Sequence, residues 1–355
     1  MLIDLNAPLP VREGEELPIE PLEAYLKEYL PGASGSLTVE QFSHGHSNLT
    51  YLLKLGDREM VLRRPPFGNQ VKTAHDMGRE YRVLSQLHPV YAPAPRPFLY
   101  CEDPSVLGDA FYVMERRNGV ILRKQLPSGL GIDETTAKRL SEALIDNLVA
   151  LHALDYHSAG LSGLGKPEGY VRRQVEGWSK RHVQAMTEAL PSMDRIATWL
   201  GENLPKESRA SVIHNDYKYD NLLLHPDDLT RVEAVLDWEM ATLGDPLMDL
   251  GTTLGYWVEA NDPEELQAAA FGPTALPGNL TRSQLIERYE EQSGHKVNNP
   301  VFYYCFGVFK IAVIIGQIYA RFVRGHTQDP RFAHLDRIVA VMSQQANAVI
   351  QRGDL

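Results

Sequence analysis

Cysteine is scarce in this chain, and basic residues are outnumbered by acidic ones. Only two of the 355 residues are cysteine, Cys101 and Cys305, and their wide separation does not match the spacing of metal ligands. This scarcity argues against a disulfide framework and favours two buried thiols in a reducing cytoplasm, where we expect the protein to act. The formal net charge of −11 disfavours non-specific binding to nucleic acid or to an anionic membrane.

The sequence also lacks a signal-peptide pattern and a clear membrane span. Asp4 stands early in an N-terminal segment that has no basic stretch followed by an apolar one, so we expect no secretory signal. The most apolar run, residues 301–320, contains Lys310 and Gln317, and both are costly at the centre of a bilayer. We therefore expect a buried core helix here, and neither a membrane nor a nucleic acid as a partner.

No internal repeat or low-complexity tract is present, and turn residues divide the chain into three predicted parts. Residues 1–35 read as an N-terminal arm with a short helix, residues 36–117 as a small lobe, and residues 118–355 as a larger, mainly helical lobe. The small lobe is predicted to contain strands at 37–40, 50–55, 59–63 and 111–115 and a helix at 76–87. The larger lobe is predicted to contain helices at 134–154, on both sides of Pro191, from 281, at 300–322 and at 331–351.

The most informative stretch is His-Asn-Asp-Tyr-Lys-Tyr-Asp-Asn at 214–221, followed by Leu-Asp-Trp-Glu at 236–239. It supplies Asp216, then Asn221 five residues on, then Asp237. Phosphoryl transfer from a nucleotide needs a base that orients the attacking hydroxyl and oxygen ligands that hold Mg²⁺. Short predicted strands flank these residues and place them at strand ends. We predict Asp216 as the catalytic base and Asn221 and Asp237 as Mg²⁺ ligands. Their spacing resembles that of the catalytic loop and metal-binding Asp in the protein-kinase-like fold.

Two further residues of this stretch have competing interpretations. Lys218 is predicted as a catalytic cation near the transferred phosphate, and a surface lysine is the alternative. His214 could be a catalytic acid or a metal ligand. We favour a structural role for His214, with its ring under the loop and hydrogen-bonded to backbone.

The small lobe offers candidate nucleotide-binding residues. Arg63 ends a predicted strand and Glu80 lies on the next helix, the places where a kinase-like fold has a phosphate-binding cation, usually lysine, and its carboxylate partner. Arg64 is the alternative if the register differs by one residue, because one step along a strand changes the face.

Two loops could complete the nucleotide site. Ser47 and Asn48 lie in a polar turn whose small residues would let backbone N–H groups approach phosphate. The turn lacks a full Gly-x-Gly-x-x-Gly pattern, so an ordinary hairpin is the alternative. Met114 and Glu115 end a strand where an interlobe hinge would meet an adenine ring, and a plain loop explains them equally well.

The segment after Asp237 carries a prediction about the substrate. Asp249 is predicted as a buried anchor that hydrogen-bonds the catalytic-loop backbone, with Asp245 and Pro246 fixing a turn before it. The spacing leaves no room for the long activation segment with which protein kinases dock polypeptides. We therefore expect a small hydroxylated substrate.

Several stretches together carry a family resemblance: GHSNLTYLL (45–53), MVLRRPP (60–66), AHDMGREY (74–81), FYVME (111–115), LHAL (151–154), VIHND (212–216) and VLDWE (235–239). Over residues 36–350 the chain resembles the aminoglycoside phosphotransferase and choline kinase-like superfamily. Within it, the likeness is nearest the branch found alone in bacteria or fused to acyl-CoA dehydrogenase domains.

The resemblance implies an α+β, two-lobed protein-kinase-like fold. Its N-lobe would be a small antiparallel sheet plus a helix, and its C-lobe mainly helical. It also implies ATP or GTP and Mg²⁺ as cofactors, and the fused branch implies hydroxy acids or hydroxyacyl-CoA thioesters as substrates. Two other functions compete with this small-molecule kinase. One is a non-catalytic nucleotide-binding protein of the same fold, and the other is a metal hydrolase using His214, Asp216 and Asp237.

Overall fold

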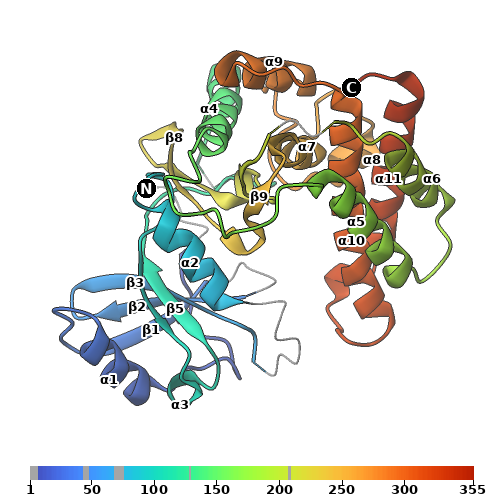
Figure 1. The fold of residues 1–355 in the computed structure, drawn as a ribbon. Coiled ribbons are helices and arrows are strands. Elements are labelled where there is room, and N and C mark those ends of the chain that lie inside the picture. The colour runs from blue at the N-terminus through green and yellow to red at the C-terminus, as the bar shows by residue number, and fades with distance from the viewer. Residues whose placement is uncertain (1–6, 43–47, 68–75, 128, 207–208) are drawn as a thin grey trace.

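A five-stranded antiparallel sheet forms the centre of the small lobe, with strand order β1-β2-β3-β5-β4 (Figure 1). The computed structural model describes residues 7–42, 48–67, 76–127, 129–206 and 209–355. The sheet strands are β1 Leu37–Gln41, β2 Leu49–Leu55, β3 Arg58–Arg64, β4 Pro97–Cys101 and β5 Phe111–Glu115, and the helices of this lobe are α1 Ile19–Tyr29, α2 Met77–Leu87 and α3 Pro104–Leu107.

Alternation along β3 assigns the two faces of the sheet to two helices. Met60 and Leu62 pack into the same core cluster as Leu22 and Leu26 of α1. Val61 belongs to the main core cluster together with the apolar residues of α2. Each strand residue therefore faces α1 or α2 according to its parity, as the pleat requires. The predicted N-terminal arm is thereby packed onto the small lobe through α1.

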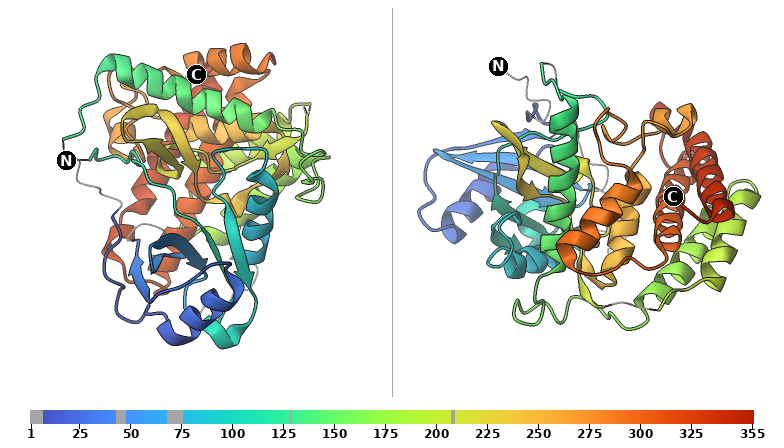
Figure 2. Two further views of the ribbon diagram at one scale, coloured as in Figure 1. Left: turned by 90° about the vertical axis from the view of Figure 1, so that its left-hand side faces the viewer. Right: turned by 90° about the horizontal axis from the view of Figure 1, so that it is seen from above.

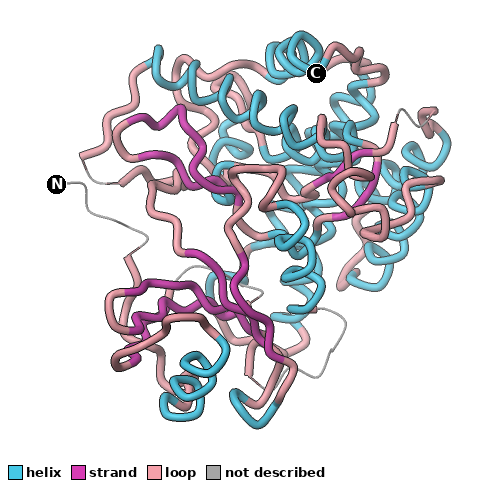
Figure 3. The backbone as a smooth tube through the Cα atoms, turned by 60° about the vertical axis from the view of Figure 1, so that its left-hand side comes forward, coloured by secondary structure: helices cyan, strands magenta, loops and turns pink. Residues whose placement is uncertain are grey.

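The larger lobe is mainly helical, with two small antiparallel strand pairs on the side that faces the small lobe (Figures 2 and 3). Its helices are α4 Glu134–His152, α5 Tyr170–Ala185, α6 Pro191–Glu202, α7 Pro246–Tyr256, α8 Glu264–Ala268, α9 Arg282–Ser293, α10 Pro300–Val323 and α11 Leu335–Arg352. The strand pairs are β6 Ser211–Ile213 with β9 Thr242–Gly244, and β7 Leu222–His225 with β8 Asp228–Val235.

The predicted α+β two-lobed fold is confirmed, and most predicted elements lie within a few residues of their positions. Pro191 begins α6, and Thr281 caps α9 with a reciprocal capping box to Gln284. The sequence interpretation missed β4, an edge strand that begins at a proline, and the three-residue β9. Both cysteines are buried free thiols, as expected.

The apolar run at 301–320 forms α10, which by length and composition alone could cross a membrane. In the structure most of its residues are buried in the larger lobe. It packs against α7 at a contact between two glycines. A Cβ on Gly307 would lie 2.0 Å from the carbonyl oxygen of Gly251, a separation no real contact shows. The two helix backbones can approach this closely only because both residues are glycine.

We expect Gly307→Ala to destabilise the fold by about 3 kcal/mol, the upper part of the overpacking range, because the added methyl group meets rigid backbone. Gly316→Ala on the same helix is the matched control, since a Cβ there meets nothing within 4 Å. The control should be neutral or stabilise by up to about 1 kcal/mol. Urea unfolding of both variants measures the difference, and equal midpoints would contradict this packing argument.

Candidate active site

The catalytic-loop prediction falls on a loop held between short strands. β6 ends at Ile213, the loop follows, and a 3₁₀ turn over Tyr219–Asn221 leads into β7. The backbone carbonyl of Asn221 accepts from the N–H of Leu236 at 2.8 Å, so Asn221 lies beside the residue that precedes Asp237. The structure therefore brings the predicted base and the two predicted metal ligands into one region, although they are up to 21 residues apart in sequence.

His214 holds this arrangement together through its ring. Nε2 donates to the carbonyl oxygen of Leu236 at 2.9 Å, and Nδ1 accepts from the backbone N–H of Asp216 at 3.3 Å. Burial lowers the pKa of His214, so the ring is neutral. Because both ring nitrogens are engaged by backbone, His214 has the structural role that its position suggested. Among the residues that the structure describes, no three or more His, Cys, Asp and Glu side chains form a metal-binding group. The engagement of both His214 ring nitrogens by backbone argues against a metal hydrolase that uses this residue.

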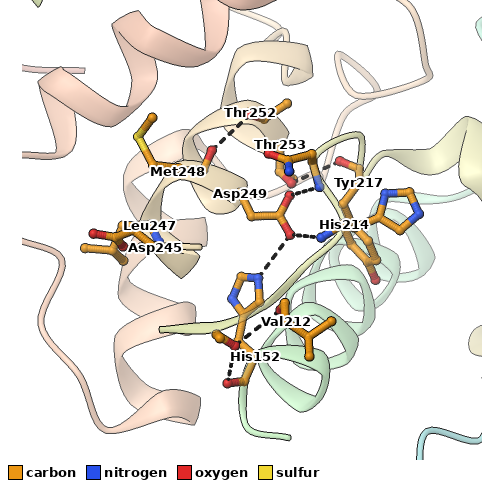
Figure 4. A network of polar contacts seen from close by, with 12 residues as sticks. His152, Val212, His214, Tyr217, Asp245, Leu247, Met248, Asp249, Thr252 and Thr253 are labelled. Carbon is orange, nitrogen blue, oxygen red and sulfur yellow. Dashed lines mark hydrogen bonds and ion pairs between the residues drawn. The ribbon is translucent and has the colours of Figure 1, made fainter. Parts of the chain in front are cut away.

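Helix α7 contacts the catalytic loop along one face, through Asp249, Thr253 and Tyr256, which are four and three residues apart. Figure 4 shows Asp249 and Thr253 beside His214 and Tyr217 of the loop. The buried carboxylate of Asp249 accepts from the backbone N–H groups of His214 and Asn215, both at 2.7 Å. Asp249 is thus the buried anchor that the sequence predicts. Burial alone would raise the pKa of Asp249, but a hydrogen bond from His152 and the backbone bond lower it.

His152, which donates from Nε2 to Asp249 at 3.2 Å, was missed as a site residue. Its signal in the sequence is a polar residue directly after the leucines that recur along one face of α4, which are Leu140, Leu144, Leu148 and Leu151. The second ring nitrogen of His152 lies 2.9 Å from the hydroxyl of Tyr289. This buried chain of contacts supports the loop from below, which is where Figure 4 shows the His152 ring relative to Asp249.

Asp216 has a carboxylate whose two oxygens face different partners. Oδ2 accepts from Lys218 Nζ at 2.7 Å and from the amide nitrogen of Asn221 at 2.9 Å, and Oδ1 accepts from the hydroxyl of Tyr256 at 2.7 Å. Burial opposes ionisation, but Lys218 and Tyr256 outweigh it and lower the pKa of Asp216. The side chain is 19% exposed, so an ionised carboxylate can be reached from outside.

Lys218 is held between Asp216 and the ring of Tyr256, with Nζ 4.5 Å from the ring centroid. Burial alone would lower the pKa of Lys218, but Tyr256 and Asp216 together raise it. The alternative of a plain surface lysine is wrong, because the Lys218 side chain is only 19% exposed.

A second lysine supports the loop and was not assigned to the site. Lys310, noted in the sequence only as a charge within an apolar run, donates from Nζ to the carbonyl oxygen of Asn215 at 2.5 Å. Burial lowers the pKa of Lys310 to about 8. Asn215 has a left-handed backbone with φ 68°, a conformation that asparagine tolerates better than most residues. The charge in α10 thus fixes the loop beside the base.

On the opposite side, Arg63 meets its predicted partner Glu80 and, in addition, Asp237. Its Nη1 donates to Glu80 at 2.5 Å and its Nη2 to Asp237 at 3.0 Å. Burial alone would lower the pKa of Arg63, but Glu80 and the other acidic groups raise it, so the guanidinium stays charged. Arg64 points to the other face, where it bonds the carbonyl of Leu107 and lies 3.6 Å from the ring centroid of Phe67. The alternative register is therefore wrong, and Arg63 is the residue that faces the site.

The remaining small-lobe candidates are Ser47, Asn48, Met114 and Glu115. Asn48 donates from Nδ2 to Glu239 at 2.9 Å, while Ser47 lies outside the described residues. Met114 is buried in β5, and Glu115 ends that strand with its carboxylate bonded to Arg117 at 2.9 Å. A bridge between Val120 and Leu224 follows, so Glu115 lies just before the chain enters the larger lobe.

Glu239 is a further carboxylate of this region, and burial raises its pKa to about 8.

Asp237, with 33% of its side chain exposed, has a left-handed backbone with φ 67°. A non-glycine residue in this conformation is uncommon and is often found at functional sites.

Residues 38–282 match the family model described as the phosphotransferase enzyme family. The protein belongs to this family. Acyl-CoA dehydrogenase family member 11 of Rattus norvegicus is 37% identical over 317 residues, which cover 87% of this chain and 40% of that protein. The chain therefore spans about two fifths of the length of this relative. The resemblance inferred from the sequence is confirmed.

Solved structures agree with this membership. A Ralstonia eutropha protein named for the aminoglycoside phosphotransferases is 32% identical, with a TM-score of 0.80 over 95% of this chain and 99% of that one. Choline kinase from Cryptosporidium parvum shares the fold at 13% identity, with a TM-score of 0.61 over 94% and 97%. Spectinomycin phosphotransferase, solved with ADP and spectinomycin, shares it at 12% identity, with a TM-score of 0.58 over 92% and 97%.

Proposed function

We propose that this phosphotransferase is a small-molecule kinase that transfers the γ-phosphoryl group of ATP or GTP to a hydroxyl of a small substrate. The observation that carries the proposal is the ionised, partly exposed carboxylate of Asp216, held by Lys218, Asn221 and Tyr256. A binding protein without catalysis has no need of such a base. The nucleotide complex of a protein with the same fold supports a nucleotide as the phosphoryl donor.

The donor atoms of the site fit Mg²⁺. Mg²⁺ prefers oxygen ligands and is usually held by one or two protein groups together with phosphates and water. Asp237 supplies a partly exposed carboxylate. Both hydrogen bonds from Asn221 to Asp216 use its amide nitrogen, so its amide oxygen is the atom that could meet a cation. When bound, Mg²⁺ would offset the charge of the β- and γ-phosphates.

The roles of the protein groups follow from their places. The acceptor oxygen bonds to the γ-phosphorus, the bond from that phosphorus to the bridging oxygen breaks, and the nucleoside diphosphate leaves. Asp216 orients the acceptor hydroxyl and receives its proton. In this proposal Lys218 offsets charge on the transferred group, and Arg63 contacts the other phosphates. Positioning and electrostatics supply most of the catalysis.

The acceptor is a small molecule in this proposal. Only the short stretch from Trp238 to Asp245 separates Asp237 from α7, so no segment there can dock a polypeptide. Hydroxy acids and hydroxyacyl-CoA thioesters are the first acceptors to test, because a relative that contains this region is named as an acyl-CoA dehydrogenase family member.

Two measurements test the proposal. Calorimetry should show binding of ATP or GTP that strengthens with Mg²⁺. Nucleotide consumption should then rise with at least one acceptor from a panel of hydroxy acids, their CoA thioesters, choline and aminoglycosides. Binding without turnover on any acceptor would favour the non-catalytic alternative, and absence of nucleotide binding would refute the kinase.

A further inference from the structure

The segment that carries Asp237 is bonded to the small lobe at almost every residue. Arg63 of β3 contacts the side chain of Asp237, and Glu80 of α2 accepts from the backbone N–H of Trp238 at 3.2 Å. Asn48 contacts the carboxylate of Glu239 at 2.9 Å. These bonds cross from one lobe to the other and converge on residues 237–241, next to the predicted metal ligand.

Arg79 contributes two bonds of a different kind, because they fix backbone. Its Nη1 donates to the carbonyl oxygen of Glu239 at 2.8 Å, and its Nη2 donates to the carbonyl oxygen of Ala241. The planar guanidinium has donors at fixed positions and can span two acceptors at once, which a lysine ammonium does less well. Arg79 lies in the first turn of α2, whose N-terminus is capped by Asp76. Figure 1 shows α2 at the junction of the two lobes.

The carbonyl oxygen between those of Glu239 and Ala241 is bonded by the larger lobe. Met240 accepts from the side-chain amide of Asn215, a residue of the catalytic loop, at 3.1 Å. Three successive carbonyls are therefore bonded in turn to α2, to the catalytic loop and to α2 again. If the segment moved with α2, its position relative to the catalytic loop and the base would change. If it stayed with the base while α2 moved away, its bonds to α2 would break.

We propose that Arg79 is a positioning residue that ties the metal-binding segment to α2, so that the placement of the small lobe sets the affinity for the divalent cation. The inference rests on the proposed function in so far as Asp237 is a ligand of that cation. Arg79 touches neither the substrate nor the metal in this scheme. It acts through the backbone of Glu239 and Ala241, and thereby on Asp237.

The test compares Arg79→Gln, Arg79→Lys and the matched control Arg82→Gln. Arg82 lies one turn further along α2 with 65% of its side chain exposed, and its nearest acidic partner is Asp76 at 3.8 Å. Calorimetry measures the affinity for Mg²⁺, and for Mn²⁺ as a second probe, in the presence of a non-hydrolysable ATP analogue. The affinity for the analogue alone and the melting temperature are measured in parallel.

Arg79→Gln should weaken the divalent-cation affinity by about tenfold, the lower end of what outer-shell partners of metal ligands contribute. The affinity for the analogue without metal should change less than twofold. Arg79→Lys should recover part of the loss by bonding one carbonyl, and Arg82→Gln should match the wild type. If Arg79→Gln does not fold, the same comparison is made with Arg79→Lys, for which a partial loss is expected.

Three results would overturn the inference. One is unchanged cation affinity in Arg79→Gln, or in Arg79→Lys where only that variant folds. Another is an equal loss of analogue affinity with and without metal, which would indicate general loosening of the lobes. The third is an equal loss in the control. A wild type that binds no metal-nucleotide at all would instead refute the proposed function, and the inference with it, so the two failures are distinguishable.

Discussion

Asp216→Ala is expected to abolish turnover while leaving nucleotide affinity nearly unchanged. The carboxylate is the group that orients the acceptor hydroxyl and takes its proton, and a positioned general base contributes about 10²–10⁴-fold to a rate. Within the described part of the chain, its carboxylate bonds to Lys218, Asn221 and Tyr256, all of the larger lobe. Removal of the carboxylate should therefore spare the groups that would hold the nucleotide.

Asp216→Asn sharpens this experiment, because it keeps the shape of the side chain and removes only the basic oxygen. Both variants are assayed for turnover with the acceptor found in the panel and for nucleotide binding by calorimetry. Asp227→Ala, in the exposed turn between β7 and β8, is the control and should retain full activity. Full activity in Asp216→Ala would show that the base has been assigned to the wrong residue.

The catalytic stretch could be identified from the sequence because its chemistry is local. Asp216, Lys218 and Asn221 lie within six residues, and the short strands on both sides have recognisable patterns. The choice between Arg63 and Arg64 could not be made from the sequence, because it depends on strand register. The turn at Gly56 pairs Leu55 with Arg58, and this register directs Arg63 toward α2 and Asp237.

Most of the groups that support the site could not be predicted from the sequence. Lys310, Tyr256 and Arg79 lie between 40 and 137 residues from Asp216, and each bonds the catalytic loop or the metal-binding segment only after the helices have packed. Read locally, Lys310 is a charge in an apolar run and Arg79 one of several charges on a helix. Asp249 was the exception, because a carboxylate soon after Asp237 already suggested an anchor.

Asp237→Ala is expected to abolish turnover in a different way, by removing the carboxylate that would hold Mg²⁺. A metal ion stabilises the charge of a phosphoryl-transfer transition state by several kcal/mol, so we expect a rate loss of at least about 100-fold. The strengthening of nucleotide binding by Mg²⁺ should also disappear, whereas it should persist in Asp216→Ala. This contrast separates the base from the ligand within one set of titrations.

The ion pair with Arg63 gives the Asp237 experiment a second consequence. Arg63 contacts both Glu80 and Asp237, with only 10% of its side chain exposed, so Asp237→Ala leaves it paired with Glu80 alone. Because one buried partner remains, we expect the variant to fold, which a melting curve checks. Glu233→Gln on β8, paired with Arg231 at the surface, is the control and should bind and turn over as the wild type does. An Asp237→Ala variant whose nucleotide affinity still rises with Mg²⁺ would place the metal ligand elsewhere.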